Sequence, residues 1–150
     1  IGVHDMDRSI AFYRDIVGFD RLLFDTIGSD PTFDALFGGD LKYREALLGK
    51  SHSLNSPFLV PDGGRLRLIQ ALNYGGKDIF KGRLWGDIGQ MEFCFEVRDI
   101  RATVENLESN GKKIFHPPTF MNMGSGSSGY FSYIKDPDGN KICAYLAKAK

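Results

Sequence analysis

The sequence predicts an α+β fold made of two copies of one unit, in which a strand and a helix are followed by three further strands (βαβββ). Two observations support this prediction. A strand–helix pattern occurs twice, 94 residues apart, so that Val3 matches Val97. A turn followed by a strand of alternating polarity also occurs twice, 76 residues apart, so that Pro61 matches Pro137.

The two helices are predicted from apolar residues that recur on one helical face. These residues are Met6, Ile10, Tyr13 and Val17 in the first copy, and Ile100, Val104 and Leu107 in the second. Gly18 and Gly111 follow them and are suited to end a helix. We therefore expect helices at residues 6–17 and 100–110.

The first strand of each copy is expected at residues 1–5 and 91–99. The chain begins at Ile1 rather than at Met, so the first of these strands is expected to be truncated. The second strand alternates, with Met91, Phe93, Phe95 and Val97 on one face and Glu92, Cys94 and Glu96 on the other. Its apolar face is expected to pack on the helix of its own copy.

The last strand of each copy is expected at residues 65–70 and 141–146. Each follows a turn rich in Pro, Asp and Gly, the first formed by Pro61, Asp62 and Gly63. The second turn, at residues 136–140, is predicted to be tight, with Gly139 at positive φ.

The remaining segments are assigned from the two offsets and from composition. Because the offsets differ by 18, the first copy carries 18 extra residues, which we place at 26–43 with a short helical turn. A glycine-containing linker at 74–89 separates the modules 1–73 and 90–150. The Gly- and Ser-rich segment 121–129 is predicted to be a mobile loop, since a phosphate-binding loop would lead into a helix.

Composition and charge narrow the classes of function. The 150 residues include 19 basic and 19 acidic side chains, so no overall field favours nucleic acid or an anionic membrane. No apolar run approaches the ~18 residues needed to cross a bilayer, and no signal peptide is visible. Cys94 and Cys143 are too few for a disulfide scaffold, so we expect two free thiols in a cytoplasmic protein.

Three stretches, taken in order, resemble the vicinal oxygen chelate superfamily, which includes glyoxalase I, bleomycin-resistance proteins, extradiol dioxygenases and methylmalonyl-CoA epimerase. They are "VHDMDRSIAFYRDIVGF", "FEVRDIRATVENLESNGKKI" and "YIKDPDGNKI". The resemblance extends over nearly the whole chain. It implies a cupped, partly open barrel around a small-molecule pocket, with polar strand faces lining the pocket. It also implies that a homodimer is one available arrangement, since relatives often pair modules across a dimer.

The resemblance further implies four metal-ligand positions, two per module. On the first strands these are Glu92 and a position upstream of Ile1. On the last strands they are Arg67 and Cys143, which are also repeat partners at the offset of 76. Arg67 carries a permanent positive charge and has no lone pair for a cation, and a thiolate is a poor ligand for magnesium or manganese. We therefore expect no divalent metal and no other cofactor.

At these positions Glu92 and Arg67 have two alternative roles. Either they form an ion pair that holds the modules together, or Arg67 binds an enolate oxygen while Glu92 moves a proton. Further candidates for ligand binding on the cavity side are Cys143, Tyr133, Tyr145, Glu96 and His4. His52 and His116 lie in loop-like surroundings and are expected at the surface.

Three functions follow, and the choice between enzyme and binding protein stays open. The first is a metal-independent isomerase, epimerase or lyase that acts on a small anionic or carbonyl-bearing molecule in the cavity between the modules. The second is a non-catalytic drug- or metabolite-binding protein of the resistance type, with an aromatic cleft. The third is a metal-dependent lyase or dioxygenase with a rearranged site that uses Glu92.

Overall fold

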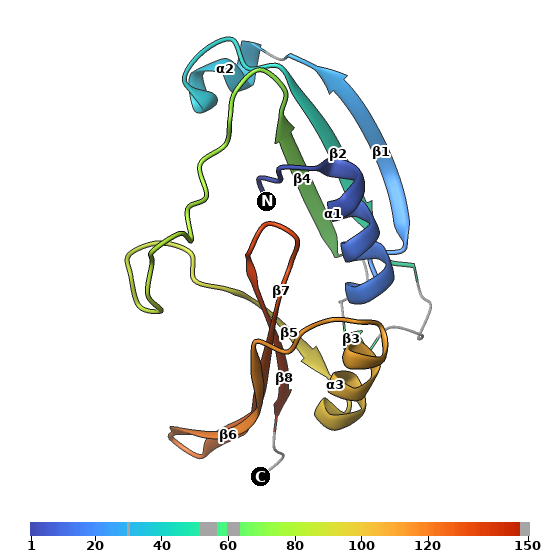
Figure 1. Cartoon of the computed structure of the whole chain (residues 1–150), viewed down its shortest axis with the longest axis vertical. Coiled ribbons are helices and arrows are strands. Elements are labelled where there is room, and N and C mark those ends of the chain that lie inside the picture. The colour runs from blue at the N-terminus through green and yellow to red at the C-terminus, as the bar shows by residue number, and fades with distance from the viewer. Residues whose placement is uncertain (30, 52–56, 60–63, 148–150) are drawn as a thin grey trace.

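The chain forms two β-sheets with helices packed against them, in a computed structural model that describes residues 1–29, 31–51, 57–59 and 64–147 (Figure 1). The elements are α1 (Met6–Phe12), η1 (Tyr13–Val17), β1 (Arg21–Gly28), α2 (Pro31–Phe37), β2 (Tyr43–Gly49), β3 (Phe58–Leu59), β4 (Arg65–Ala71), β5 (Phe93–Val97), α3 (Ile100–Ser109), β6 (His116–Gly124), β7 (Ser127–Lys135) and β8 (Lys141–Ala147). The first sheet has the order β1-β2-β4 and the second β3-β5-β8-β7-β6. The predicted α+β class is confirmed, and the sheets do not close into a barrel.

The two sheets repeat one arrangement of strands. In the second sheet β5 runs parallel to β8, with Glu96 opposite Tyr145. In the first sheet the N-terminal segment forms a single parallel bridge to β4, between Gly2 and Ile69. Gly2 precedes Glu96 by 94 positions and Ile69 precedes Tyr145 by 76, as the sequence offsets require. The bridge is shorter than the strand predicted at 1–5.

The central strand pairs repeat as well. Arg67 on β4 lies opposite Leu47 on β2, and Cys143 on β8 lies opposite Tyr133 on β7, both in antiparallel register. Arg67 and Cys143 therefore occupy equivalent positions in the two sheets, as the offset of 76 predicts.

Both main helices begin at an aspartate and end near a glycine. Asp5 and Asp99 accept hydrogen bonds from backbone N–H groups of the first helical turn, which satisfies donors that the helix leaves unpaired. The first helix continues from α1 into a π-helical turn, η1, and stops at Gly18, whose φ is 93°. Gly111, with φ of 68°, follows α3. The predicted helices are confirmed, and within the described residues no helix is long and apolar enough to cross a membrane.

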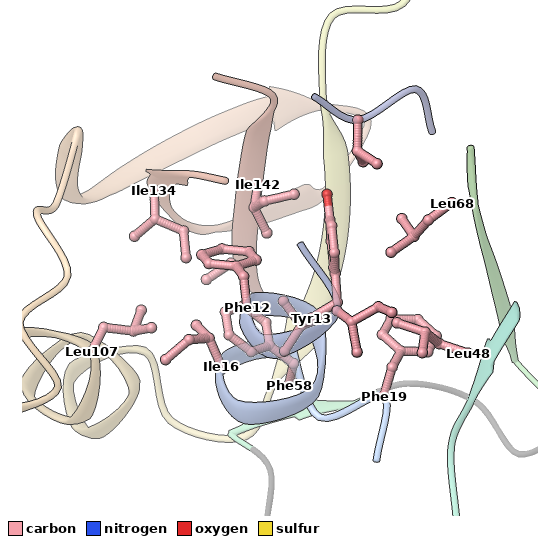
Figure 2. Packing of buried hydrophobic residues seen from close by; sticks show 14 of the residues in the cluster. Phe12, Tyr13, Ile16, Phe19, Leu48, Phe58, Leu68, Leu107, Ile134 and Ile142 are labelled. Atoms are coloured by element: carbon pink, nitrogen blue, oxygen red, sulfur yellow. The ribbon is translucent and has the colours of Figure 1, made fainter. Parts of the chain in front are cut away.

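The hydrophobic core is continuous between the two modules, because the first helix contributes to both. Figure 2 shows Phe12 and Ile16 on the side of Ile134 and Ile142, which belong to β7 and β8. Phe19 lies on the other side, toward the strands of the first sheet. The α3 helix packs against β6, β7 and β8. Burial of this shared core therefore fixes the modules relative to each other.

The tight turn before β8 also joins the modules. Asp136 is buried, and its carboxylate accepts hydrogen bonds from the backbone N–H of Asp138 at 3.0 Å, the backbone N–H of Asn140 at 2.8 Å and the hydroxyl of Tyr13 at 2.7 Å. Burial raises the pKa of Tyr13, and the charge and hydrogen bond of Asp136 raise it further. Gly139 has φ of 87°, which confirms the predicted positive φ in this turn.

The connecting segments match the predictions in part. The insertion contains a short helix, α2, as expected, and residues 72–92 form no helix or strand. The loop predicted at 121–129 is wrong, because β6 and β7 continue into a hairpin there. Ser125 and Gly126 at its tip have φ of 49° and 77°, the positive values that a two-residue hairpin turn requires.

His52 and His116 were both predicted to lie at the surface. His116 is exposed as predicted, but it begins β6 instead of lying in a loop. His52, and the first turn at residues 61–63, lie outside the described residues.

Candidate functional site

Three polar side chains come together where β5 and β8 run side by side. They are Glu92, Cys94 and Cys143, which we call the Glu–Cys–Cys cluster. One carboxylate oxygen of Glu92 and the two sulfur atoms all lie within 4.8 Å of one another. Cys94 and Cys143 face each other in parallel register, with their sulfur atoms 2.7 Å apart. Glu92 immediately precedes β5, and its carboxylate reaches the two sulfur atoms from there.

Two ring residues border this cluster. Tyr133, opposite Cys143 on β7, makes side-chain hydrogen bonds with Glu92 and Cys143. Trp85, in the segment between the modules, donates from its indole N–H to a Glu92 oxygen at 3.4 Å. Burial raises the pKa of Tyr133, and the charge of Cys143 and the contacts with Glu92 add to the rise. The tyrosine hydroxyl therefore stays protonated and remains a donor at neutral pH.

The two thiols differ in exposure and in acidity. Cys94 is exposed and Cys143 is buried. The hydrogen bond with Cys143 lowers the pKa of Cys94. The same hydrogen bond, followed by burial and by the charge of Cys94, raises the pKa of Cys143. Of the two, Cys94 is the thiol that ionises first.

Arg67 lies on the first sheet, where its Nε is 2.6 Å from a carboxylate oxygen of Glu45. The structure gives Arg67 an ion pair with Glu45, whereas the sequence suggested one with Glu92. Glu45 is two residues from Leu47, which stands opposite Arg67, so the pair is a diagonal contact between neighbouring strands. The strand register was the signal that could have identified it.

The other predicted ligand-binding residues lie away from the cluster. Glu96 and Tyr145 lie farther along β5 and β8, and His4 lies beside the turn that precedes β8. Glu96 is exposed and stands opposite Tyr145, whose ring stacks on Phe131 at 4.7 Å between centroids. His4 is exposed, and its backbone N–H donates to Asp138 in the turn before β8 at 3.1 Å. Of the predicted residues, the structure therefore brings together Glu92, Cys143 and Tyr133.

Two residues of the site had no role assigned from sequence: Cys94, which belongs to the cluster, and Trp85, which borders it. Cys94 alternates in phase with Glu92, so the strand pattern already placed both on one face. Trp85 had no comparable signal, because it belongs to a segment without regular structure.

A separate groove of about 770 Å³ lies on the helical side of the molecule. It runs between α1, the segment after α3 and the turn before β8, and its lining includes Phe12, Ile16, Lys112 and Phe115. None of the three residues of the Glu–Cys–Cys cluster lines this groove, so the groove and the cluster are separate features. The chemistry of the side chains, rather than the volume of this groove, identifies the candidate site.

Comparison with known proteins assigns the family. The profile of the Glyoxalase/Bleomycin resistance protein/Dioxygenase superfamily matches residues 1–144. The chain belongs to this superfamily. A lactoylglutathione lyase from Haemophilus influenzae is 30% identical over 141 residues, which cover 93% of this chain and 83% of that protein.

Two further relatives of this superfamily member support the assignment. A probable lactoylglutathione lyase from Vibrio cholerae is 26% identical over 140 residues, covering 93% of this chain and 81% of that protein. The crystal structure of a glyoxalase family protein from Bacillus cereus superposes with a TM-score of 0.68, at 16% identity, over 99% of this chain and 91% of that one. At that identity the structural likeness shows the fold.

The metal-ligand positions that the superfamily implies can be tested against the residues present. Arg67 supplies no electron pair and lies on the other sheet, paired with Glu45. Glu92 and Cys143 do meet, but Cys94 joins them, so the donors are one oxygen and two sulfurs. Magnesium and manganese prefer oxygen ligands. The usual superfamily site for such an ion does not fit this set of side chains.

Proposed function

We propose that this superfamily member binds a small carbonyl-bearing or anionic molecule against the polar faces of β5 and β8. There it transfers a proton at the carbon next to the carbonyl, as an isomerase, epimerase or lyase. The observation that carries the proposal is the meeting of a carboxylate, Glu92, with a protonated hydroxyl, Tyr133, beside the cluster. A base and a hydrogen-bond donor at one place are the two groups that enolisation needs.

In this proposal Glu92 takes the proton from carbon and returns it. Tyr133 donates its hydrogen bond to the carbonyl oxygen as negative charge develops there, because its raised pKa keeps the hydroxyl protonated. Arg67 was assigned that second role from sequence, but its ion pair with Glu45 on the first sheet favours Tyr133. The names of the lactoylglutathione lyase relatives support a lyase or isomerase over a protein that only binds.

The proposal assigns no step to a metal ion. Arg67 stands at one of the superfamily's metal-ligand positions and cannot act as a ligand, and two of the three clustered ligand atoms are soft sulfur atoms. The Glu–Cys–Cys cluster itself is what favours the alternative, a metal-dependent enzyme with a rearranged site. Chelation distinguishes the two.

We also propose that the protein works as a homodimer. Large apolar side chains are exposed on β1, among them Leu22 and Ile27, and near the cluster at Trp85. Covering these side chains would supply the favourable free energy of association.

The experiment uses S-lactoylglutathione as a probe, since it carries a hydrogen on the carbon next to its thioester carbonyl. The unmodified protein, incubated with the probe in D₂O, should introduce deuterium at that carbon, measured by mass spectrometry. Glu92→Gln should slow the exchange by about 100-fold or more, as expected for loss of a general base. Glu105→Gln, the same change on the exposed face of α3, should leave the rate unchanged.

Two results would overturn the proposal. One is an exchange rate that is equal in the unmodified protein and in Glu92→Gln. The other is loss of exchange after treatment with EDTA and recovery on adding a divalent ion, which would establish the metal-dependent alternative. Binding of the probe by calorimetry without any exchange would favour the non-catalytic protein.

A further inference from the structure

Cys94 and Cys143 are placed as two residues of one disulfide would be, although both are free thiols. They stand directly opposite each other on neighbouring parallel strands. Neighbouring strands lie about 4.8 Å apart, which is within the range of Cα separations that a disulfide can bridge. Their sulfur atoms are already 2.7 Å apart.

We propose that Cys94 and Cys143 form a reversible dithiol–disulfide pair within the candidate site. The exposed Cys94 is the thiol that reacts with an oxidant from solution, and the buried Cys143 is the thiol that resolves the product. The oxidant is a small-molecule disulfide of the glutathione type. This inference rests on the strand register and the sulfur distance and does not depend on the proposed proton transfer.

The exchange proceeds in two steps. The Cys94 thiolate attacks one sulfur of the small disulfide, which forms a mixed disulfide and releases one thiolate that takes up a proton. The Cys143 thiol then loses its proton and attacks the Cys94 sulfur, which forms the protein disulfide and releases the second small thiol. Two protein thiols are oxidised, and one small disulfide is reduced to two thiols.

Closing the disulfide would change the candidate site directly. Cys143 shares hydrogen bonds with Tyr133, and Glu92 belongs to the same cluster. In the disulfide, Cys143 no longer has a thiol, so its hydrogen bonding with Tyr133 changes. The redox state of the pair would thus set the surroundings of the two groups that the proposed chemistry uses.

The test is a redox titration of the full chain. Reduced protein is equilibrated with mixtures of reduced and oxidised glutathione, quenched with N-ethylmaleimide, and examined by intact mass spectrometry without reductant. We expect a change from a species with two maleimide groups to one with none, whose mass is two hydrogens below that of the reduced, unlabelled chain. Proteolysis of the oxidised form should yield one peptide pair joined through residues 94 and 143.

Variants identify the two roles. Cys143→Ser should stop the reaction after the first step and accumulate a stable glutathione adduct at Cys94. Cys94→Ser should form much less adduct, because the remaining thiol is buried. If Cys143→Ser does not fold, Cys143→Ala is used in its place, and the titration of the unmodified protein still decides the matter.

Three outcomes would overturn the proposal. One is that both thiols remain fully labelled at the most oxidising glutathione ratio. Another is a stable adduct on Cys94 that persists in the unmodified protein and does not close to the disulfide. The third is a disulfide between two chains, seen as a doubled intact mass.

Discussion

The hydroxyl of Tyr13 donates a 2.7 Å hydrogen bond to the carboxylate of Asp136, so the first helix of one module is bound to the last turn of the other. Both residues are buried. A buried carboxylate that loses a donor keeps its desolvation cost without the compensating bond.

Replacing Tyr13 by Phe should therefore lower the free energy of unfolding by about 1–3 kcal/mol. Urea denaturation followed by circular dichroism measures the change. Tyr74→Phe, which removes a hydroxyl from an exposed tyrosine, is the matched control and should have little effect. Equal stability of the two variants would contradict the role given to this hydrogen bond.

The same residue predicts a dependence of stability on alkaline pH. The folded protein raises the pKa of Tyr13 above its ordinary value of about 10, mainly through burial. As pH rises past about 10, the unfolded chain loses this proton and the folded chain keeps it, so stability falls. The slope should be about 1.4 kcal/mol per pH unit for one such group.

Tyr133, whose pKa is also raised, contributes in the same direction. Tyr13→Phe should accordingly make the decline above pH 10 less steep without abolishing it. Denaturation midpoints measured between pH 8 and pH 11 check this, and identical slopes for the two proteins would refute it.

The turn at Gly139 offers a test of backbone conformation. Its φ of 87° is unfavourable for any residue with a Cβ atom, although a Cβ there would meet no other atom within 4 Å. Gly139→Val should therefore cost about 1 kcal/mol or more through backbone strain alone. Gly28 on β1 has equally open surroundings but an ordinary φ, so Gly28→Val should cost less. Equal losses in thermal denaturation would argue against strain at Gly139.

Elemental analysis tests whether the Glu–Cys–Cys cluster binds a divalent metal ion. We expect purified protein to contain less than one equivalent of magnesium, manganese or iron per chain, because Arg67 offers no donor and two of the clustered donors are sulfur. Treatment with EDTA should leave the denaturation midpoint unchanged. A stoichiometric ion that stabilises the fold would show that the cluster binds metal after all.

Oxidation of the thiol pair should stabilise the chain. Cys94 and Cys143 are 49 positions apart, and a disulfide closing a loop of that length lowers the entropy of the unfolded state by an amount worth about 4 kcal/mol as an upper value. The oxidised protein should unfold at higher urea concentration than the reduced protein, and dithiothreitol should reverse the shift. An oxidised form of lower stability would show that the bridge strains the strands.

Much of the fold could be predicted because the chain contains two copies of one pattern. The offsets alone imply that the bridge between Gly2 and Ile69 corresponds to the pair formed by Glu96 and Tyr145. They also place Arg67 and Cys143 at equivalent points. Local periodicity and turn chemistry are short-range properties, so one sequence is enough to reveal them.

The contacts within the site were harder to predict, since they depend on which strands become neighbours. Arg67 pairs with Glu45 because β2 lies beside β4, and β2 follows an insertion that the second module lacks. Cys94 meets Cys143 through a parallel pairing between strands far apart in the chain. Composition also misassigned the hairpin tip at Ser125, since Gly- and Ser-rich segments are common to mobile loops and to tight turns.

The position of α1 between the modules has a consequence for how the protein folds. Because this helix and the η1 turn that continues it pack on strands of both modules, the first module cannot complete its interior until the second has been synthesised. Contacts between residues so distant in sequence slow the search for the native state. The two halves, although built on one repeated pattern, should consequently unfold in one cooperative transition. The unfinished chain leaving the ribosome would expose the apolar face of α1 until the last strand has been synthesised.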